Sequence, residues 1–425
     1  MKVLIVGNGA REHAIAWKLE DSPGVTELFV APGNAGTAKL ARNVPITATD
    51  IDTLLNFSTV NSIDLTVVGP EAPLADGIAD RFLDAGQRVF GPTKRAARIE
   101  SSKSFAKDLM VRYGVPTGAA STFSSYARAQ EHIRNADPPI VVKADGLAAG
   151  KGVVVAQTRE EALEALRLQM DERRFGPAGD IVVIEEYLRG REVSVFAFVD
   201  GENVSPMVAA CDYKRAGDGD AGPNTGGMGS FSPPAVWTDA LENMVRHEVM
   251  EPVTRALAAE GSAYRGVLYA GLILTEQGPK VLEFNCRLGD PETQVVLPRL
   301  KADLLDVMIR TADGTLDGVE LEWDQRGCVG VVVASGGYPG EYSMGYPIDG
   351  LDRLDEDVIV FHAGTRPGPD AGDGRPIATT DGGRVLTVTS LGSTLEAARQ
   401  RAYANVERIS FEGAYYRTDI ASEPW

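Results

Sequence analysis

A short run near residue 285 places three polar side chains in the pattern of a site for a metal ion and a phosphate. The run reads Leu282-Glu283-Phe284-Asn285-Cys286-Arg287, and because side chains alternate along a strand, Glu283, Asn285 and Arg287 share one face. Two oxygen ligands so spaced can hold Mg²⁺ and leave positions open for phosphate and water. Arg287 could bridge a transferring phosphoryl group. An edge strand with its polar side in water fits the same alternation, but the polar turn that follows directly, Leu288–Glu292, favours a site.

A glycine-rich loop farther upstream joins two apolar strands and carries a lysine at each end. Val141–Val153 reads VVKADGLAAGKGV, with Lys143 near the end of the first strand and Lys151 near the end of the loop. This order describes a β-hairpin lid over phosphates, and it is not a Walker A motif because a strand follows the loop. Lys143 follows two valines, where an ammonium without an anionic partner would be unfavourable. A solvated hairpin with incidental lysines is the alternative.

Two further polar segments could meet the rest of a nucleotide and an acceptor. The run Glu185–Glu192 exposes backbone that could pair with an adenine edge, and Glu192 could accept hydrogen bonds from ribose hydroxyls. The glycine-rich loop 212–229 holds carboxylates and amides that suit an amino-acid ammonium or sugar hydroxyls, and loops of this length are usually functional or disordered. A solvated strand end and a mobile surface loop are the respective alternatives.

The turn after the first strand resembles the start of a dinucleotide-binding fingerprint but departs from it. Gly7-Asn8-Gly9 is followed by Glu12 where a third glycine would stand, and the next strand ends without the acidic residue that would hold an adenosine ribose. A nicotinamide or flavin role is therefore disfavoured. An anion at the helix N-terminus and a tight turn that needs glycine for backbone reasons stay open in equal measure.

Short strands closed by glycine turns must position these groups in the first part of the chain. Four apolar runs, each followed by a helical stretch, predict a parallel sheet covered on both faces. The carboxyl ends of its strands would carry a ligand pocket. The runs are Val3–Val6, Leu28–Ala31, Leu65–Val68 and Val89–Phe90, and a helix is expected at Ser101–Tyr113.

The remaining sequence predicts an α+β stretch, a set of longer strands and a last unit. In the α+β stretch, helices near Ser125–Ala136 and Arg159–Met170 alternate with strands at Ile140–Ala144, Val153–Ala156 and Ile181–Glu185. The longer strands are expected at Val193–Val199, Val267–Leu274 and Lys280–Asn285. The last unit, opened by Gly327, has expected strands at Val329–Ala334, Val358–His362 and Arg384–Ser390.

The charge of the chain limits what can bind to it. With 425 residues, 42 Lys+Arg and 60 Asp+Glu, the net charge is −18, so we expect neither nucleic acid nor an anionic membrane as a partner. A phosphorylated small molecule would need a few placed cations or a metal ion. The three cysteines form no CxxC pair, which favours a reducing compartment. No apolar run approaches the ~18 residues that span a bilayer, so we expect a soluble, cytoplasmic protein.

Taken together, these segments resemble an ATP-grasp ligase, and most closely the phosphoribosylamine–glycine ligase family. The matching stretches, in chain order, are GNGAREHA, APGNAGT, GPEAPL, SKSFAKD, VVKADGLAAGKGV, EEYLRGREVS, DYKRAGDGDAGPNTGGMGS and LEFNCRLGDPETQ, and they span residues 7 to 294. The resemblance implies an α/β fold, α+β in places. Its parts would be an N-terminal parallel-sheet pre-ATP-grasp domain at 1–100, an ATP-grasp central domain at 101–120 and 190–326, a small mobile lid subdomain at 121–189, and a small C-terminal α/β domain at 327–425.

The resemblance also implies an activity. ATP would phosphorylate the carboxylate of glycine, and the amine of 5-phosphoribosylamine would attack the glycyl phosphate, giving glycinamide ribonucleotide, ADP and phosphate. The implied partners are these small-molecule substrates, with Mg²⁺ or Mn²⁺ as cofactor, and a monomer is expected. Such a ligase would serve de novo purine biosynthesis at its second step. The chemistry needs positioning and electrostatics and no covalent protein nucleophile.

Carried onto this sequence, the family's motifs imply roles for particular residues. Catalysis would rest on Arg287 and Lys143, and the metal on Glu283 and Asn285 alone, because the preceding strand, Leu268–Leu272, offers no further carboxylate. ATP would be bound by Lys103, Lys143, Gly146, Ala149, Gly150, Lys151, Gly152, Glu185, Glu186, Tyr187, Leu188 and Glu192. Glycine and the sugar phosphate would be bound by Gly9, Asn34, Glu71, Asp212, Lys214, Asn224, Thr225 and Arg287.

Three other functions stay open at this point. An ATP-grasp carboxylase or a formate-using relative would share the fold, although the Arg287–Glu292 run and the 212–229 loop argue against it. A non-catalytic nucleotide-binding or scaffolding protein would bind ATP without turnover. An NAD-dependent oxidoreductase would bind NADH.

Overall fold

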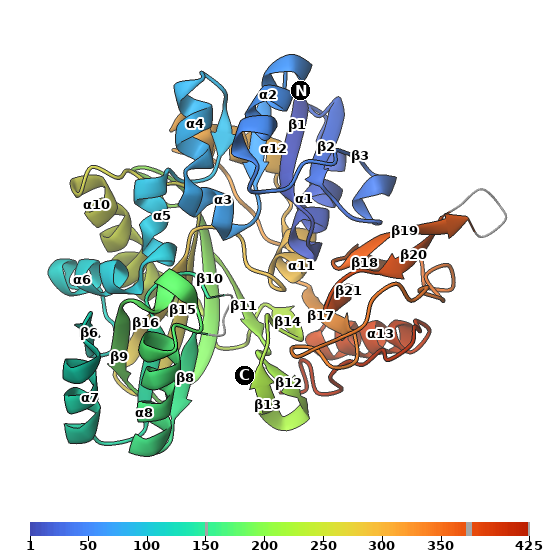
Figure 1. Ribbon diagram of the computed structural model, residues 1–425. Coiled ribbons are helices and arrows are strands. Elements are labelled where there is room, and N and C mark those ends of the chain that lie inside the picture. Colours follow the sequence, from blue (N-terminus) through green and yellow to red (C-terminus); the bar gives the residue numbers. More distant parts are fainter. Residues whose placement is uncertain (149–151, 371–375, 424–425) are drawn as a thin grey trace.

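Five parallel strands form the N-terminal sheet, of which the four glycine-closed runs predict all but the short edge strand β3. The computed structural model describes residues 1–148, 152–370 and 376–423 (Figure 1). The strand order is β3-β2-β1-β4-β5, and every pairing is parallel. Leu4 and Val6 of β1 pack into one hydrophobic cluster and Val3 and Ile5 into another, so both faces of the sheet are covered. The strands are β1 (Lys2–Gly7), β2 (Glu27–Pro32), β3 (Arg42–Asn43), β4 (Leu65–Val68) and β5 (Val89–Phe90).

A larger sheet runs through the middle of the molecule and is antiparallel throughout. Its strand order is β16-β15-β10-β11-β14-β17-β21-β18. The strands are β10 (Arg191–Asp200), β11 (Val208–Asp212), β14 (Gly229–Ser232), β15 (Arg265–Thr275), β16 (Gly278–Asn285), β17 (Gly327–Ala334), β18 (Val358–His362) and β21 (Arg384–Gly392). The strands expected after Gly327 are present, but they continue the central sheet instead of forming a separate one. The domain boundaries drawn from the sequence stay a prediction.

A small antiparallel sheet with two helices has a hydrophobic core of its own. Its order is β6-β9-β7-β8, and Figure 1 shows it beside β16 at the lower left. Ile133, Ile140, Val142, Leu166 and Ile184 are among the buried residues of this core. The elements are β6 (Ala120–Phe123), α7 (Tyr126–Asn135), β7 (Ile140–Ala144), β8 (Val153–Ala156), α8 (Arg159–Leu166) and β9 (Val182–Glu186).

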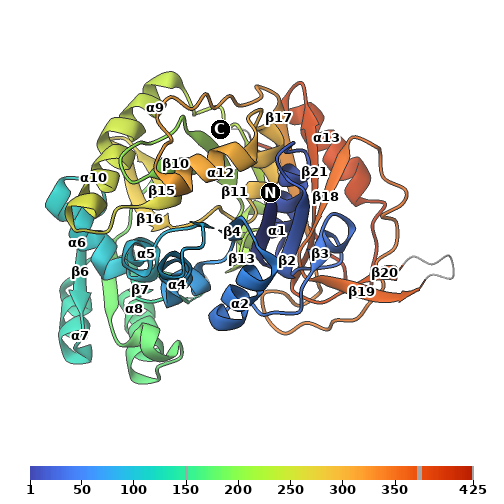
Figure 2. The ribbon, with the colours of Figure 1, turned by 90° about the horizontal axis from the view of Figure 1, so that it is seen from above.

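Helices and short hairpins complete the molecule, and Figure 2 shows how α13 lies along β17 and β21. The helices are α1 (Ala10–Glu20), α2 (Ile51–Asn61), α3 (Glu71–Asp76), α4 (Ile78–Asp84), α5 (Lys94–Ser101), α6 (Lys103–Tyr113), α9 (Asp239–Val245), α10 (Glu251–Ala259), α11 (Thr293–Val296), α12 (Leu304–Asp313) and α13 (Leu395–Val406). The hairpins are β12 (Arg215–Gly217) with β13 (Ala221–Asn224), and β19 (Thr365–Asp370) with β20 (Pro376–Thr380). Within the described ranges, no helix has the length and apolar character needed to cross a bilayer.

Three local predictions differ from the structure. The helix predicted at Ser101–Tyr113 begins at Lys103, because α5 occupies the chain up to Ser101 and the Ser102 hydroxyl caps α6 by accepting the N–H of Phe105 at 3.2 Å. The helix predicted near Arg159–Met170 is α-helical only to Leu166, and the chain continues as a π turn over Arg167–Asp171. The 212–229 segment is not a plain loop, since it contains the β12–β13 hairpin. That hairpin has no apolar alternation that could have predicted it.

Two buried histidines join α1 to β18. The backbone N–H of His362 donates to Nδ1 of His13 at 2.8 Å, and His362 Nδ1 lies 3.1 Å from the hydroxyl of Thr365. Burial lowers the pKa of His13 to about 3, and Lys39 acts in the same direction. Burial, with His13 and Lys39 nearby, also holds the pKa of His362 well below its ordinary value. Both side chains are therefore neutral in the folded protein near pH 7.

We expect the contribution of these two histidines to the free energy of unfolding to fall as the pH drops below about 6.5, because in the unfolded chain they then take up protons that they cannot accept when buried. The stabilisation from His13 is fully present above its unfolded pKa and is lost progressively toward its folded pKa of about 3. The comparison uses pH 7.5 and pH 5.5, about one unit above and about one unit below the unfolded pKa. Over this range each of the two histidines should lower the free energy of unfolding by about 1.4 kcal/mol. Urea unfolding at both pH values measures it.

The variant His13→Gln should lose about 1.4 kcal/mol less on this acidification than the wild type does. His247→Gln, at an exposed position, is the matched control and should follow the wild type. Equal pH dependence of His13→Gln and the wild type would contradict the interpretation.

Candidate active site

A cleft of about 1040 Å³ lies where the small sheet faces β16 and the start of α6. It is large enough for several small molecules at once. Most of the predicted site residues line it, namely Glu71, Lys103, Lys143, Gly152, Glu185, Glu186, Tyr187, Leu188, Glu192, Asp212, Lys214, Asn224, Thr225, Glu283, Asn285 and Arg287. The predicted ATP-binding residues Ala149, Gly150 and Lys151 lie outside the described residues.

Strand β16 presents its polar residues to this cleft. In the register with β15, Glu283 lies opposite Gly271 and Asn285 opposite Tyr269. Strand β16 is the edge strand that the alternative interpretation proposed, but its polar side faces the cleft lining instead of open water. Burial acts to raise the pKa of Glu283, yet Lys214, Lys143, Lys103 and Arg287 outweigh it and hold the pKa below its ordinary value. The Glu283 carboxylate is therefore ionised at neutral pH.

Two carboxylates hold Arg287 from either side. Its Nε lies 3.1 Å from Glu71 Oε2, and its Nη2 lies 3.0 Å from Glu100 Oε1. Burial opposes the charge on Arg287, but Glu100 and Glu71 raise its pKa above the ordinary value. Glu71 has a pKa lowered to about 2, because Arg287 and Arg11 outweigh the effect of its burial. The guanidinium is thus fixed in orientation and stays charged.

Lys143 has the anionic partner that its apolar setting requires. Its Nζ lies 3.0 Å from Glu185 Oε1 and donates to the backbone oxygen of Leu282 at 3.2 Å. The other oxygen of Glu185 lies 2.9 Å from Nζ of Lys107, which the sequence reasoning missed. All three charged side chains are less than a tenth exposed. One buried carboxylate therefore serves two buried ammonium groups.

Lys103 links α6 to the loop after β7. Its Nζ donates to the carbonyl oxygen of Gly146 at 3.1 Å, while Asp145 accepts the backbone N–H of Ser104 at 2.6 Å. Burial lowers the pKa of Lys103, and Glu283 opposes that shift. Gly146 itself does not line the cleft. A Cβ on it would come within 2.8 Å of Ala178, so its place in the motif fits close packing.

The opposite part of the cleft carries a charge cluster from β10, β11 and the residues that directly follow β11. Lys214 Nζ lies 2.5 Å from Glu192 Oε2. Burial opposes the charge on Lys214, but Asp212 and Glu192 raise its pKa well above the ordinary value. Burial also raises the pKa of Asp212, and Glu292 adds to that shift against the opposing effect of Lys214. The predicted ribose acceptor Glu192 is therefore already paired with a lysine.

Two predicted substrate residues lie outside the cleft lining. The backbone N–H of Gly9, the residue that caps α1, donates to Glu12 Oε2 at 2.6 Å and is therefore already satisfied within the protein. The Asn34 side chain is buried and fully used within the protein. Its Oδ1 accepts the N–H of Gly36 at 2.8 Å, and its Nδ2 donates to the carbonyl oxygens of Asn8 and His362. These contacts favour the tight-turn interpretation of the glycine motif over the anion site.

Sequence reasoning missed several charged or polar residues of the cleft lining, which are Arg11, Glu100, Lys107, Asp290, Glu292, Tyr338 and Arg384. Lys107 stands four residues after Lys103 on one helix, a spacing that places both on the same side and could have indicated it. Tyr338 and Arg384 come from the C-terminal part of the chain, and no local motif marks them.

The chain matches known proteins along its whole length. Residues 1–100, 101–293 and 328–423 match, in turn, the N domain, the ATP-grasp (A) domain and the C domain of phosphoribosylglycinamide synthetase. A phosphoribosylamine–glycine ligase from Halalkalibacterium halodurans is 51% identical over 423 residues, covering 100% of this chain and 97% of that protein.

Solved structures agree with these matches. The crystal structure of a phosphoribosylamine–glycine ligase from Thermotoga maritima has 36% identity and a TM-score of 0.83, covering 99% of this chain and 100% of that one. The biotin carboxylase domain of a 2-oxoglutarate carboxylase from Hydrogenobacter thermophilus, with 16% identity and a TM-score of 0.73, shares the fold alone; it covers 98% of this chain and 91% of that one.

The fold and the cleft define an ATP-grasp ligase. Within that class, the three domain matches and the full-length identity settle the family: the chain belongs to the phosphoribosylglycinamide synthetase family. The resemblance and the fold class predicted from the sequence are confirmed, and the oxidoreductase and scaffolding interpretations are set aside.

The shared carboxylate of Glu185 generates a prediction about stability. Replacing it by glutamine would leave the ammonium groups of Lys143 and Lys107 buried without their anion, so Glu185→Gln should lower the free energy of unfolding by about 3 kcal/mol. Urea unfolding without ATP measures this. Glu186→Gln, at the exposed neighbouring position, is the control and should lose about 1 kcal/mol or less. Equal losses in the two variants would show that the charge triad does not carry the effect.

Proposed function

We propose that this chain joins glycine to 5-phosphoribosylamine with ATP, through glycyl phosphate, giving glycinamide ribonucleotide, ADP and phosphate. One observation supports it above the others. In a chain of net charge −18, the cleft gathers Lys103, Lys143 and Arg287 around the ionised carboxylate of Glu283. That is the charge arrangement needed to bring a nucleotide, an amino acid and a sugar phosphate together. Membership of the family supports the same substrates.

In the first step, a carboxylate oxygen of glycine attacks the γ-phosphorus of ATP, and ADP leaves. Lys103 and Lys143 would contact the phosphate oxygens, and Arg287 would stabilise the transferring group. Arg287 suits this role because its two carboxylate partners fix its orientation before the substrates bind. In the second step, the amine of phosphoribosylamine attacks the acyl carbon, and phosphate leaves. The protein positions the reactants and stabilises charge, with no covalent bond to a side chain.

Glu283 and Asn285 fit a divalent cation. Both oxygen-bearing side chains come from one strand and line the cleft, and the lowered pKa of Glu283 keeps it an anionic ligand. Among the described residues, no group of three or more His, Cys, Asp or Glu side chains forms a metal cluster, so ATP and water would complete the coordination. Mg²⁺ or Mn²⁺ held there would offset the phosphate charge during transfer.

The remaining residues are assigned to substrates by the end of the cleft at which they lie. The end of β9, from Glu185 to Leu188, would meet the adenine, and Glu192 with Lys214 would lie near the ribose. Asp212, Asn224 and Thr225 would meet glycine or the sugar, together with Glu71 and Arg287. For Gly9 and Asn34, the described contacts support a role in shaping the first turn.

We also propose that the enzyme acts as a monomer in the cytoplasm, in the second step of de novo purine biosynthesis. Cys211, Cys286 and Cys328 are all buried and free, which suits a reducing compartment.

The acceptor decides between this function and that of another ATP-grasp enzyme. With phosphoribosylamine and Mg²⁺ present, ADP release should require glycine, and bicarbonate or formate should not replace it. Coupled detection of ADP, with mass spectrometry of the product, measures this. Turnover that is independent of glycine would overturn the proposal in favour of a carboxylase-like or formate-using enzyme.

The proposed metal ligand gives a second test. Glu283→Gln should reduce glycine-dependent ADP release by about 10²-fold or more, because the cation and the phosphates lose their anionic anchor. Chelation by EDTA should stop the wild-type reaction, and added Mg²⁺ or Mn²⁺ should restore it. Glu276→Gln, at the exposed turn of the same β15–β16 hairpin, is the matched control and should retain wild-type activity. Retained activity in Glu283→Gln would show that Glu283 is not a metal ligand.

A further inference from the structure

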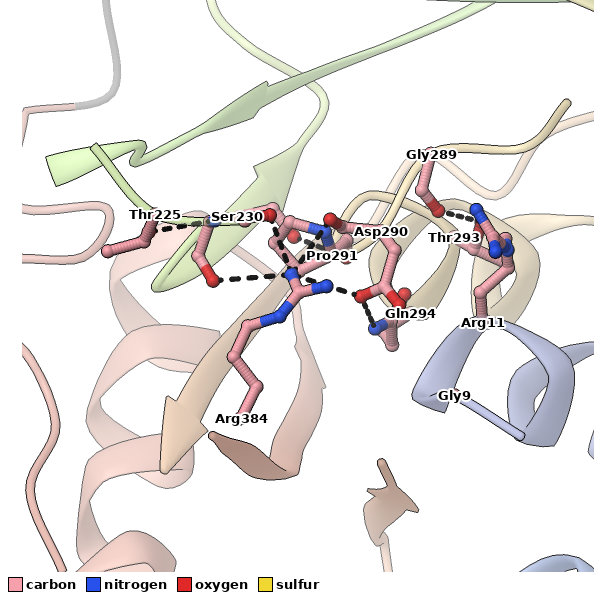
Figure 3. A network of polar contacts seen from close by, with 12 residues as sticks. Gly9, Arg11, Thr225, Ser230, Gly289, Asp290, Pro291, Thr293, Gln294 and Arg384 are labelled. Atoms are coloured by element: carbon pink, nitrogen blue, oxygen red, sulfur yellow. Dashed lines mark hydrogen bonds and ion pairs between the residues drawn. The ribbon is translucent and has the colours of Figure 1, made fainter. Parts of the chain in front are cut away.

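Arg384, at the start of β21, reaches from the C-terminal part of the chain into the cleft lining. Figure 3 shows its guanidinium between the turn that precedes β14 and the turn that follows β16. Its Nη1 donates to the carbonyl oxygen of Gly226 at 2.6 Å and to that of Asp290 at 2.8 Å, and it lies 3.4 Å from the carbonyl oxygen of Gly227. The same nitrogen lies 3.3 Å from the Asp290 carboxylate. One side chain thus joins the turn before β14 to the turn after β16.

The fit between Arg384 and the first turn is close. A Cβ on Gly226 would come within 2.9 Å of Arg384 Cζ, and one on Gly227 would come within 2.4 Å of Pro291 Cδ. Gly227 also has φ +108°, a conformation that favours glycine. Gly226 therefore lets the guanidinium lie directly against backbone, and Gly227 lets the turn pack against Pro291.

Thr225 is connected to this contact through the same turn. Its hydroxyl accepts the N–H of Gly227 at 2.9 Å and donates to the carbonyl oxygen of Lys214 at 2.9 Å. The N–H of Gly226 donates to the Tyr338 hydroxyl at 2.9 Å, so a second residue from the C-terminal part holds the turn. Thr225 lines the cleft, and its N–H also donates to the carbonyl oxygen of Lys214 at 2.7 Å, so the Arg384 contact reaches Thr225 through Gly226 and Gly227.

The second turn leads directly to the proposed catalytic arginine. Asp290 follows Arg287 by three residues, and its Oδ1 accepts from Gln294 Nε2 at 2.9 Å. In the strand order of the central sheet, β21, which begins at Arg384, lies far from β16, and Figure 1 shows it on the other side of the molecule from the small sheet.

We propose that Arg384 is a positioning residue for the acceptor substrates, glycine and the sugar phosphate, and not for ATP. It acts by holding the Thr225–Gly227 turn and Asp290 at a fixed distance from each other beside Arg287. Without it, the carbonyl oxygens of both turns and the Asp290 carboxylate lose a charged donor, and the turns can separate. Displacements of about 1 Å near reacting groups can reduce rates by about 10²-fold. This inference rests on the proposed function.

The neighbouring hairpin has an anchor of its own, which keeps the effect local. Arg417 Nη1 donates to the carbonyl oxygen of Arg215 at 3.0 Å and to Asp220 Oδ1 at 2.9 Å, and its other nitrogens pair with Asp419. The β12–β13 hairpin is therefore held independently of Arg384. Loss of Arg384 should move the Thr225–Gly227 turn and leave the hairpin in place.

The test compares full-length Arg384→Gln, Arg384→Lys and Arg366→Gln. Arg366, exposed on β19, is the matched control from the same part of the chain. In Arg384→Gln, kcat/KM for glycine or for phosphoribosylamine should fall by about tenfold or more, while the KM for ATP changes by less than about twofold. Arg384→Lys keeps the charge but not the planar fork, and should recover part of the loss. Arg366→Gln should match the wild type.

A merely structural role for Arg384 would raise the KM for ATP together with those of the acceptors, and that result would overturn the inference. So would unchanged kinetics for both acceptors. If Arg384→Gln does not fold, Tyr338→Phe replaces it, because this change removes only the acceptor of the Gly226 N–H. It should lower kcat/KM for an acceptor substrate by a smaller factor and leave the KM for ATP unchanged. An equal effect on the KM for ATP would again overturn the inference. Failure of the proposed function would be distinguishable, because the wild type itself would then show no glycine-dependent ADP release.

Discussion

Buried carboxylates hold the cations of the cleft in place, and the rest of the site depends on this pairing. A lysine or arginine that is largely removed from water needs an anion nearby, or its charged form becomes unfavourable. Glu185 serves both Lys143 and Lys107, and two acidic side chains hold Arg287. Neither Lys143 nor Arg287 has all its donors used by its ion pairs, because an ammonium carries three N–H groups and a guanidinium five. The pairs therefore orient the cations and leave donors that, under the proposed function, would bind phosphate oxygens.

This arrangement explains how an acidic protein can bind several anionic molecules. The net charge of −18 works against binding at a distance, so the attraction must be local and short-ranged. The cations come from α6, β7 and the segment after β16, which belong to different sheets and layers. The fold brings these elements together, and the buried pairs fix their side chains before any substrate arrives.

The sequence predicted the parts of the fold whose signal is local. Continuous apolar runs predicted most strands of both large sheets, although β3, β11 and β14 were not predicted. The period of two placed Glu283 and Asn285 on one face of β16, and Arg287 lies just beyond the end of that strand. The sequence could not predict that the C-terminal strands continue the central sheet, because strand pairing between β14 and β17 depends on contacts far apart in the chain. The β12–β13 hairpin was not predicted for another reason. Its residues are polar and rich in glycine, so no hydrophobic pattern indicates it. The family's motif implied a substrate role for Asn34, which stays a prediction; in the structure its amide bonds to buried backbone groups, a contact that a local motif cannot reveal.

Different kinds of interaction hold the two ends of the cleft. At the end formed by the small sheet and α6, side-chain charges are paired with one another in buried positions. At the end formed by β14 and β21, an arginine bonds mainly to backbone carbonyl oxygens of a glycine turn. Charge pairs of the first kind respond to any change in charge, even when shape is preserved. Contacts of the second kind respond to shape as well, because a single added Cβ at Gly226 would displace the guanidinium. Under the proposed roles, nucleotide binding would depend mainly on the first kind of contact and acceptor binding on the second, and Arg287 would lie between them.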